Sequence, residues 1–238
     1  MRPLSMALIL LAFSSCTSYQ YLTLDSPEVQ KNDKKEFSWQ NDTLRLTYNF
    51  HGEGGPVSLT VFNKTDKPLY VNWKKSALIR DSQAISLFNS NVQIGGNVDS
   101  YSYGGKYFRA TTGSLSASFD LPVGVDLIPP GSYVNKNLQA LVQPSAVYTD
   151  RFMDNTKPEK MTDFSGASYS YRRYSFDRGS SPLQFKSYLA FVLGDGEKEF
   201  YVSHSFYAQE ILLSSEVPEF FGFYKPEGDK LFVKHSGQ

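Results

Sequence analysis

Apolar and polar residues alternate with a period of two over much of the chain that follows residue 36. The alternation covers 44–50, 57–62 and 69–73, and clusters rich in Gly, Pro, Asn and Asp separate these segments. Strict alternation is typical of a β-strand that buries one face against a core. Three such segments in close succession, joined by short polar turns, predict an antiparallel meander.

The last third of the chain repeats this pattern. A long apolar and aromatic segment at 182–193 is followed by a turn sequence at 194–197 and by a returning segment at 199–207, which together predict a hairpin. Further short strands are expected at 211–213, 220–224 and 231–233. No window after Cys16 carries the apolar stripe of a helix over three turns. We therefore predict an all-β fold, an antiparallel β-sandwich of which an immunoglobulin-like arrangement is one form, with a closed β-barrel as the alternative.

Two segments in the middle of the chain are rich in Tyr, Ser and Gly. They span 94–118 and 150–181, and a short strand at 123–128 that ends at Pro129 lies between them. Segments of this length inside a compact domain are either loops that carry function or disordered chain. We expect them to be long loops of one domain that covers residues 36–238.

Composition and charge narrow the classes of protein that the chain can represent. Aromatic residues make up 15% of the 238 residues and there is one cysteine, so the chain is neither disordered nor a disulfide scaffold. The 24 Lys and Arg residues equal the 24 Asp and Glu residues in number, which argues against a nucleic-acid partner. No apolar run reaches the ~18 residues that a membrane-spanning helix needs.

The first sixteen residues carry the most specific signal in the chain. Arg2 supplies a positive charge, residues 7–13 are apolar, and the small residues Ser14 and Ser15 precede Cys16. This order of charge, short apolar stretch and small residues is typical of a secretory signal peptide. The chain becomes polar directly after Cys16.

The sequence Phe13-Ser14-Ser15-Cys16 resembles the lipobox of bacterial lipoproteins, although Phe13 stands where Leu is commonest. The resemblance implies that residues 1–15 are a lipoprotein signal peptide, that the Cys16 thiol receives a diacylglyceryl group, and that the new amino terminus is acylated, for example with palmitate. Two or more acyl chains hold a protein on a membrane stably, whereas one holds it only marginally. The alternative is an ordinary secretory signal that is cut near Cys16.

This resemblance also implies a location and a partner. We expect the mature protein to lie in the cell envelope, anchored to a membrane on its extracytoplasmic side, which is the outer membrane in a Gram-negative bacterium. Residues 16–35 include a charged run at 31–36 and little periodicity, so we expect a flexible tether. A tether of about twenty residues would reach about 25 Å and lift the domain off the lipid. The alternative is that part of this segment adds an edge strand.

Candidate catalytic groups are few. The chain has three histidines, and His204 shares its expected strand face with Phe200, Val202 and Phe206, which predicts a core histidine. There is no Gly-x-Ser-x-Gly nucleophile motif and no His-Glu-x-x-His metal motif. The acids Asp150, Asp154 and Asp163 could meet in space, but solvated loop acids are the simpler interpretation. We therefore expect no catalytic residue, no metal and no cofactor, and the protein is more consistent with a binding role than with an enzyme.

Tyrosines in the two Tyr-rich segments are the only residues that suggest a ligand. The candidate ligand-binding side chains are Tyr101, Tyr103, Tyr107, Tyr169, Tyr171 and Tyr174. Rigid rings with a polar tip, set among Ser and Gly, suit adaptable recognition surfaces and can stack on sugars. The alternative is that alternate tyrosines pack an aromatic core.

The sequence therefore predicts a lipid-anchored binding or structural module of the bacterial cell envelope, with a glycan or an envelope protein as its partner. One alternative is a glycan-binding surface lipoprotein that uses the Tyr-rich segments. Another is an envelope hydrolase with paired carboxylates, whose separation in space a sequence cannot give.

Overall fold

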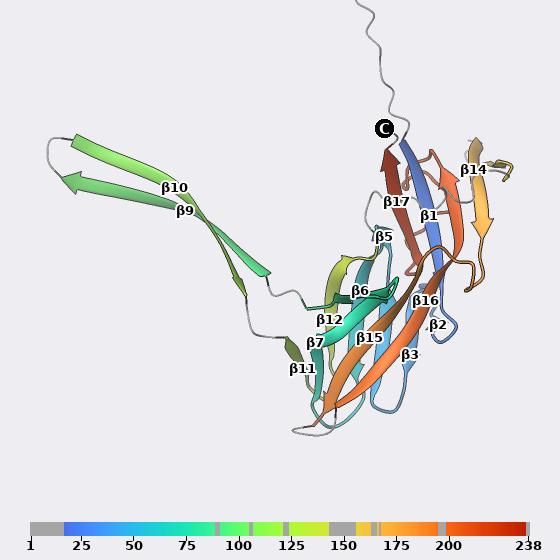
Figure 1. Ribbon diagram of the computed structural model, residues 1–238, viewed down its shortest axis with the longest axis horizontal. Coiled ribbons are helices and arrows are strands. Elements are labelled where there is room, and N and C mark those ends of the chain that lie inside the picture. The colour runs from blue at the N-terminus through green and yellow to red at the C-terminus, as the bar shows by residue number, and fades with distance from the viewer. Residues whose placement is uncertain are drawn as a thin grey trace, which may run out of the picture.

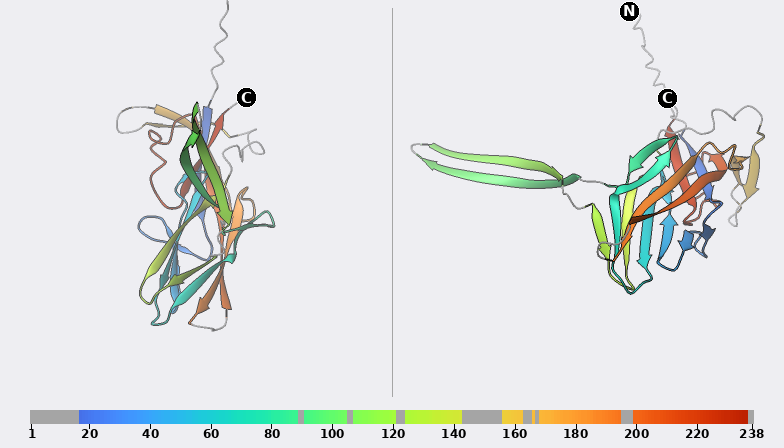
Figure 2. Two further views of the ribbon diagram at one scale, coloured as in Figure 1. Left: turned by 90° about the vertical axis from the view of Figure 1, so that its left-hand side faces the viewer. Right: turned by 60° about the horizontal axis from the view of Figure 1, so that its bottom comes forward.

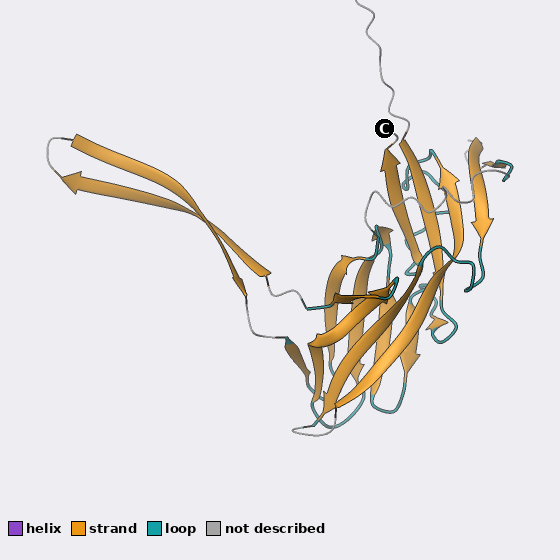
Figure 3. Cartoon of the chain, viewed as in Figure 1, coloured by secondary structure: helices purple, strands orange, loops and turns teal. Residues whose placement is uncertain are grey.

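The computed structural model describes residues 17–88, 91–104, 107–120, 124–142, 156–162, 166, 168–194 and 199–236. The expected signal peptide at residues 1–15, Cys16 and the three candidate metal acids Asp150, Asp154 and Asp163 lie outside these residues. The described chain is built of strands and turns and contains no helix (Figure 3). The strands are β1 (Thr17–Asp25), β2 (Gln30–Lys31), β3 (Phe37–Gln40), β4 (Leu44–Asn49), β5 (Gly52–Glu53), β6 (Pro56–Asn63), β7 (Leu69–Arg80), β8 (Gln83–Ser86), β9 (Asn91–Gly104), β10 (Tyr107–Asp120), β11 (Val125–Ile128), β12 (Tyr133–Ala140), β13 (Glu159–Thr162), β14 (Ser168–Ser175), β15 (Gln184–Leu193), β16 (Glu199–Ser214) and β17 (Lys230–Ser236).

Two sheets pack face to face and form the body of the molecule (Figure 1). The larger sheet has ten strands and runs β11-β7-β15-β16-β1-β17-β5, with β14 also paired to β16, β13 to β14 and β8 to β7. The smaller sheet has five strands in the order β12-β6-β4-β3-β2. Large side chains from both sheets, including Trp73, Tyr48 and Phe206, are fully buried between them. The predicted all-β sandwich is confirmed, and its strand numbers exceed the seven to nine of immunoglobulin domains.

The larger sheet curls around the smaller one, so that the two approach each other at both edges. At one edge β5 pairs in parallel with β17. Along the chain, β5 connects β4 and β6, which both belong to the smaller sheet. At the other edge the chain passes directly from β11 of the larger sheet to β12 of the smaller one through the turn at 129–132. The sandwich therefore has the form of two open, curved sheets.

The predicted meander is correct for its first two strands and wrong for its third. β4 and β6 pair antiparallel, with Leu46 opposite Val61. β7 crosses to the larger sheet, where it pairs with β15 and β11. Buried Asn63 holds the crossing, since its side-chain amide donates to the backbone oxygens of Lys67 and Ile128. A period of two places one face of a strand in the core but does not say which sheet the strand joins.

The expected tether at residues 16–35 contains two strands, since residues 17–25 form β1 in the interior of the larger sheet and residues 30–31 form β2. β1 pairs antiparallel with β16 on one side and with β17 on the other. β2 is the terminal strand of the smaller sheet, so the alternative, that part of this segment adds an edge strand, holds for residues 30–31. In β1, Leu22 and Leu24 lie in the main core, whereas Tyr19 and Tyr21 lie in a second apolar cluster on the outer face of the larger sheet. Because both faces are buried, β1 lacks the alternation that reveals a half-buried strand. The folded body therefore includes residues 17–25.

The Tyr-rich segments, expected to be loops, contain strands. β9 and β10 form a hairpin with an unbroken register from Asn91 opposite Asp120 to Gly104 opposite Tyr107. This hairpin arm, residues 91–120, projects from the body (Figures 1 and 2). In the second segment, β14 pairs with the last part of β16. These strands form because each pairs with another strand along its whole length. A local sequence rich in Ser and Gly does not reveal that pairing.

Two expectations in the last third of the chain also need correction. The two strands expected at 199–207 and 211–213 are one continuous strand, β16. The strand expected at 220–224 is a series of turns. Its apolar residues are explained by packing, because Phe221 is buried in the outer cluster with Tyr21 and Tyr171. The strands predicted at 123–128, 182–193 and 231–233 correspond to β11, β15 and β17.

Candidate functional site

Two hollows in the body are candidates for a binding site. One is a cavity of about 340 Å³ between the ends of the two sheets, here called the inter-sheet cavity. The other is a shallower groove of about 520 Å³ at the β2 edge of the smaller sheet, here called the Trp39 groove. Both volumes fall within the range of small-molecule sites.

Strands from both sheets build the inter-sheet cavity. The larger sheet contributes the end of β7, the hairpin strand β8 and Phe185 of β15, and the smaller sheet contributes the second half of β12. The described lining consists of Leu78, Arg80, Ile85, Ser86, Leu87, Phe88, Lys136, Asn137, Leu138, Ala140, Leu141 and Phe185. Most of this lining is aliphatic or aromatic, and its two charged side chains are both cations.

The lining residues Lys136 and Arg80 come from opposite sheets. In β12 the half-buried side chains Val134, Lys136 and Leu138 alternate with exposed ones, and Val134 and Leu138 pack on the core. Lys136 therefore occupies a core-facing position, where its Nζ lies 5.4 Å from the centroid of the Trp73 ring. Arg80 donates a hydrogen bond to the backbone oxygen of Leu141, and this bond closes one end of the cavity.

The Trp39 groove has a different chemistry. Its lining consists of Glu28, Gln30, Lys31, Asn32, Ser38, Trp39, Gln40 and Arg45, which are polar apart from the indole. Trp39 is half-buried in β3, and its ring contacts the His204 ring beneath it at a centroid distance of 4.9 Å. An indole surrounded by amides and a hydroxyl can stack on a flat apolar face and satisfy hydroxyl groups around it.

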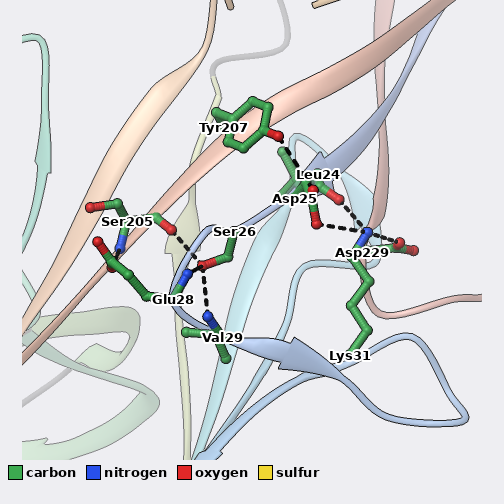
Figure 4. Close-up of polar contacts among 9 residues, drawn as sticks. All are labelled: Leu24, Asp25, Ser26, Glu28, Val29, Lys31, Ser205, Tyr207 and Asp229. Atoms are coloured by element: carbon green, nitrogen blue, oxygen red, sulfur yellow. Dashed lines mark hydrogen bonds and ion pairs between the residues drawn. The ribbon is translucent and has the colours of Figure 1, made fainter. Parts of the chain in front are cut away.

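Two charged residues of the Trp39 groove are fixed where the chain leaves β1 for the smaller sheet (Figure 4). The Glu28 carboxylate accepts the backbone N–H of Ser205 at 2.6 Å. The Lys31 ammonium donates to the Leu24 carbonyl oxygen and to the Asp229 carboxylate, both at 2.7 Å. These contacts cap β16 on the side where β1 no longer pairs with it and neutralise a buried acid, so they support the groove rather than supply free groups to a ligand.

A chain of polar side chains crosses the core behind the Trp39 groove. The Tyr48 hydroxyl lies 3.0 Å from both Ser187 Oγ and His204 Nδ1. Burial lowers the pKa of the His204 imidazole, and the nearby negative charge of Glu28 opposes this only in part. Burial also raises the pKa of the Tyr48 phenol far above its usual range. His204 is therefore a neutral, hydrogen-bonded core residue, as the sequence predicted.

The structure does not bring the six candidate tyrosines together. Tyr169, Tyr171 and Tyr174 lie in β14, whereas Tyr101 and Tyr103 lie in β9 and Tyr107 in β10. The hairpin arm and β14 are on opposite sides of the body (Figures 1 and 2). The six tyrosines therefore do not form one shared binding surface.

Two of these tyrosines are core residues. Tyr171 and Tyr174 are 6% and 7% exposed. Tyr171 lies in the outer cluster and Tyr174 in the main core, on opposite faces of β14. Their expected role as ligand-binding rings is wrong, and the alternative of an aromatic core holds for both. Tyr169 is half-buried in the same strand.

The three tyrosines of the hairpin arm are placed by backbone register alone. Tyr101 lies opposite Ala110, Tyr103 opposite Phe108 and Tyr107 opposite Gly104. Their role in binding stays a prediction.

Among the described residues, two pairs of carboxylates each share a cation. Asp25 and Asp229 both contact Lys31, and Glu159 and Glu210 both contact Arg173. The lining of the Trp39 groove includes one carboxylate, Glu28, and the described lining of the inter-sheet cavity includes none. Neither hollow offers the pair of acids that glycoside hydrolysis uses.

Within the described ranges, no three His, Cys, Asp or Glu side chains are grouped so as to hold a metal ion. The described residues also include no helix of the length and apolarity that crossing a bilayer requires.

No family model, curated protein or solved structure matches this chain. Sequence reasoning missed the residues of both hollows, although one signal was available. Lys136 falls between Val134 and Leu138 in an alternating strand, so a lysine occupies an apolar position of the pattern.

Proposed function

We propose that this protein is a lipid-anchored binding module of a bacterial cell envelope, attached through Cys16 to the extracytoplasmic side of a membrane. The resemblance of residues 13–16 to a lipobox supports the anchor. The two hollows of the body support a binding role, since concave sites with a few polar groups are where small ligands bind.

The position of β1 determines how such an anchor would join the folded body. The residue after Cys16 is Thr17, which already pairs with Ser236 at the end of β17. An acylated Cys16 would therefore continue directly into a strand of the larger sheet, with no spacer between lipid and body. Acyl chains give such an anchor about 0.8 kcal/mol for each buried methylene group.

Membrane fractionation of cells that express the protein tests this proposal. We expect the native chain in the membrane fraction, resistant to high salt and released by detergent. Cys16→Ser should move the protein to the soluble fraction, because serine cannot form the thioether. Thr17→Ser, which changes the adjacent residue and keeps the thiol, should leave it in the membrane. A Cys16→Ser variant that stays in the membrane fraction as the native chain does would overturn the proposed anchor.

A second candidate function, glycan binding, is favoured by the Trp39 groove rather than by the tyrosines. The half-buried indole lies among Gln30, Ser38 and Gln40, whose polar groups match the hydroxyls that border the apolar face of a sugar. Trp39→Ala should abolish binding on a glycan array, and Tyr169→Ala should leave it unchanged. Binding that survives Trp39→Ala, or no binding by the native chain, would remove this candidate.

A further inference from the structure

We propose that the inter-sheet cavity binds a single-chain amphiphile with an anionic headgroup, of which a fatty acid is the simplest, and that Lys136 is the residue that meets its charge. This inference gives a ligand class to the proposed binding function and rests on it. It does not depend on the lipid anchor at Cys16.

The shape and lining of the cavity favour an aliphatic chain. Leu78, Leu87, Leu138 and Phe185 give it apolar walls from both sheets. A volume of about 340 Å³ lies at the small end of ligand pockets, which suits one aliphatic chain better than a two-chain lipid. Each methylene group that leaves water on entering such a site contributes about 0.8 kcal/mol.

The charge of the cavity selects the headgroup. Lys136 lies at a core-facing position, opposite Leu59 in the register of the smaller sheet. Its ammonium lies over the Trp73 ring, and no carboxylate of the described chain lies within ion-pair distance of it. A cation in an apolar setting without an anion is unfavourable unless a ligand supplies the opposite charge. A carboxylate on an aliphatic chain supplies it.

Arg80 adds positive charge to the same cavity but has other partners. Its guanidinium donates to the Leu141 carbonyl oxygen and lies 3.6 Å from the exposed Asp81 carboxylate. Arg80 therefore shapes the cavity and strengthens its positive potential. The Lys136 ammonium is the cation that is more available to a ligand. Among the described lining residues there is no acid to repel an anionic headgroup.

Titration calorimetry with three probes of equal chain length tests the inference: dodecanoate, dodecanol and dodecyltrimethylammonium. The full-length chain carrying Cys16→Ser is used as the parent, which keeps the acyl chains of the protein itself out of the assay. We expect dodecanoate to bind one to one, and dodecanol to bind about ten- to one-hundredfold more weakly, as loss of a charge-assisted hydrogen bond predicts. The cationic probe should bind most weakly of the three.

Lys136→Met keeps an apolar side chain of similar length and removes the charge. It should lower the affinity for dodecanoate to the level of dodecanol and leave the affinity for dodecanol unchanged. Lys160→Met, at an exposed position of β13, is the matched control and should bind as the parent does. Ser86→Trp is a second variant at an exposed residue of the cavity lining, and its ring should weaken dodecanoate and dodecanol alike.

Three results would overturn the inference: no saturable binding of dodecanoate by the parent, equal affinity for the anionic and cationic probes, or unchanged dodecanoate binding by both Lys136→Met and Ser86→Trp. Each of these leaves the fractionation result for Cys16 unaffected. Conversely, loss of the anchor would leave the calorimetry unchanged, so the two failures are distinguishable.

Discussion

The Tyr48 hydroxyl oxygen lies 3.0 Å from Nδ1 of His204 and joins the smaller sheet to the larger one across the core. His204 is 3% exposed, and its ring is packed by Tyr48 and by Trp39. Glu28 is the charged group that acts on it. A proton on this imidazole would place a charge in the core, and burial therefore lowers its pKa below the ordinary value of 6.5.

This contact predicts a dependence of stability on pH. Below pH 6.5 the unfolded chain binds a proton at His204 that the folded chain does not, so the free energy of unfolding should fall as pH is lowered from 6.5 toward the depressed folded pKa. Urea denaturation across this range measures the effect. His204→Gln should be less stable at neutral pH and should show a smaller loss on acidification than the native chain. Equal slopes for the native chain and His204→Gln would contradict the prediction.

The burial of β1 predicts that its residues are essential to the fold. Leu24 is fully buried in the main core, and Leu24→Ala should lower the free energy of unfolding by about 2–5 kcal/mol because it leaves a cavity. Leu127→Ala in β11 makes the same chemical change at a side chain that is 54% exposed, and it should cost less than about 1 kcal/mol. Equilibrium denaturation compares the two. Equal, small effects would indicate that residues 17–25 are a tether after all.

The ion pair between Lys31 and Asp229 predicts a second large effect on the free energy of unfolding. The Asp229 side chain is 5% exposed, so Lys31→Met should destabilise the protein by about 3 kcal/mol by leaving a buried carboxylate without its cation. Lys75→Met removes an ion pair with Glu199 at a side chain that is 56% exposed, and should have little effect.

A double variant separates the loss of the charge pair from the loss of packing at this site. If the buried charge is the cause, adding Asp229→Asn to Lys31→Met should recover part of the lost stability, since the two residues are coupled. Additive losses in denaturation experiments would show that the pair is not coupled.

The hairpin arm predicts unequal protection of the backbone. β9 pairs with β10 and with no other strand of the described chain, and an isolated two-stranded hairpin is marginally stable in water. Amide hydrogen exchange should therefore be much faster in residues 91–120 than in the β1–β16 ladder at the centre of the larger sheet. Equal protection in the two regions would contradict this and would indicate a partner that covers the arm.

Sequence pattern predicted the strands that bury one face and missed those that do not. β4 and β6 were predictable because apolar residues, among them Leu46 and Val61, occupy every second position and alternate with more polar ones. β1 was missed because the segment at 215–229 covers its outer face, so that Tyr21 and Leu22 are buried side by side. The apolar run at 220–224 suggested a strand because a covering loop needs apolar residues as much as a strand does.

The candidate site was less predictable than the fold because its residues come from distant parts of the chain. The inter-sheet cavity joins residues 78–88 with residues 136–141, and only the crossing of β7 between the sheets brings them together. The Trp39 groove depends in the same way on contacts of Glu28 with Ser205 and of Lys31 with Asp229. Such long-range contacts leave no local spacing by which a motif could be recognised. The proposed lipid attachment at Cys16 differs in this respect, because the residues that suggest it are contiguous in sequence, and it stays a prediction.

Mass spectrometry of the amino-terminal peptide from membrane-extracted protein tests the proposed anchor at Cys16. We expect a chain that starts at Cys16, lacks residues 1–15 and carries a diacylglyceryl group on the sulfur. A mature terminus at another residue, or Cys16 recovered with a free thiol, would contradict it.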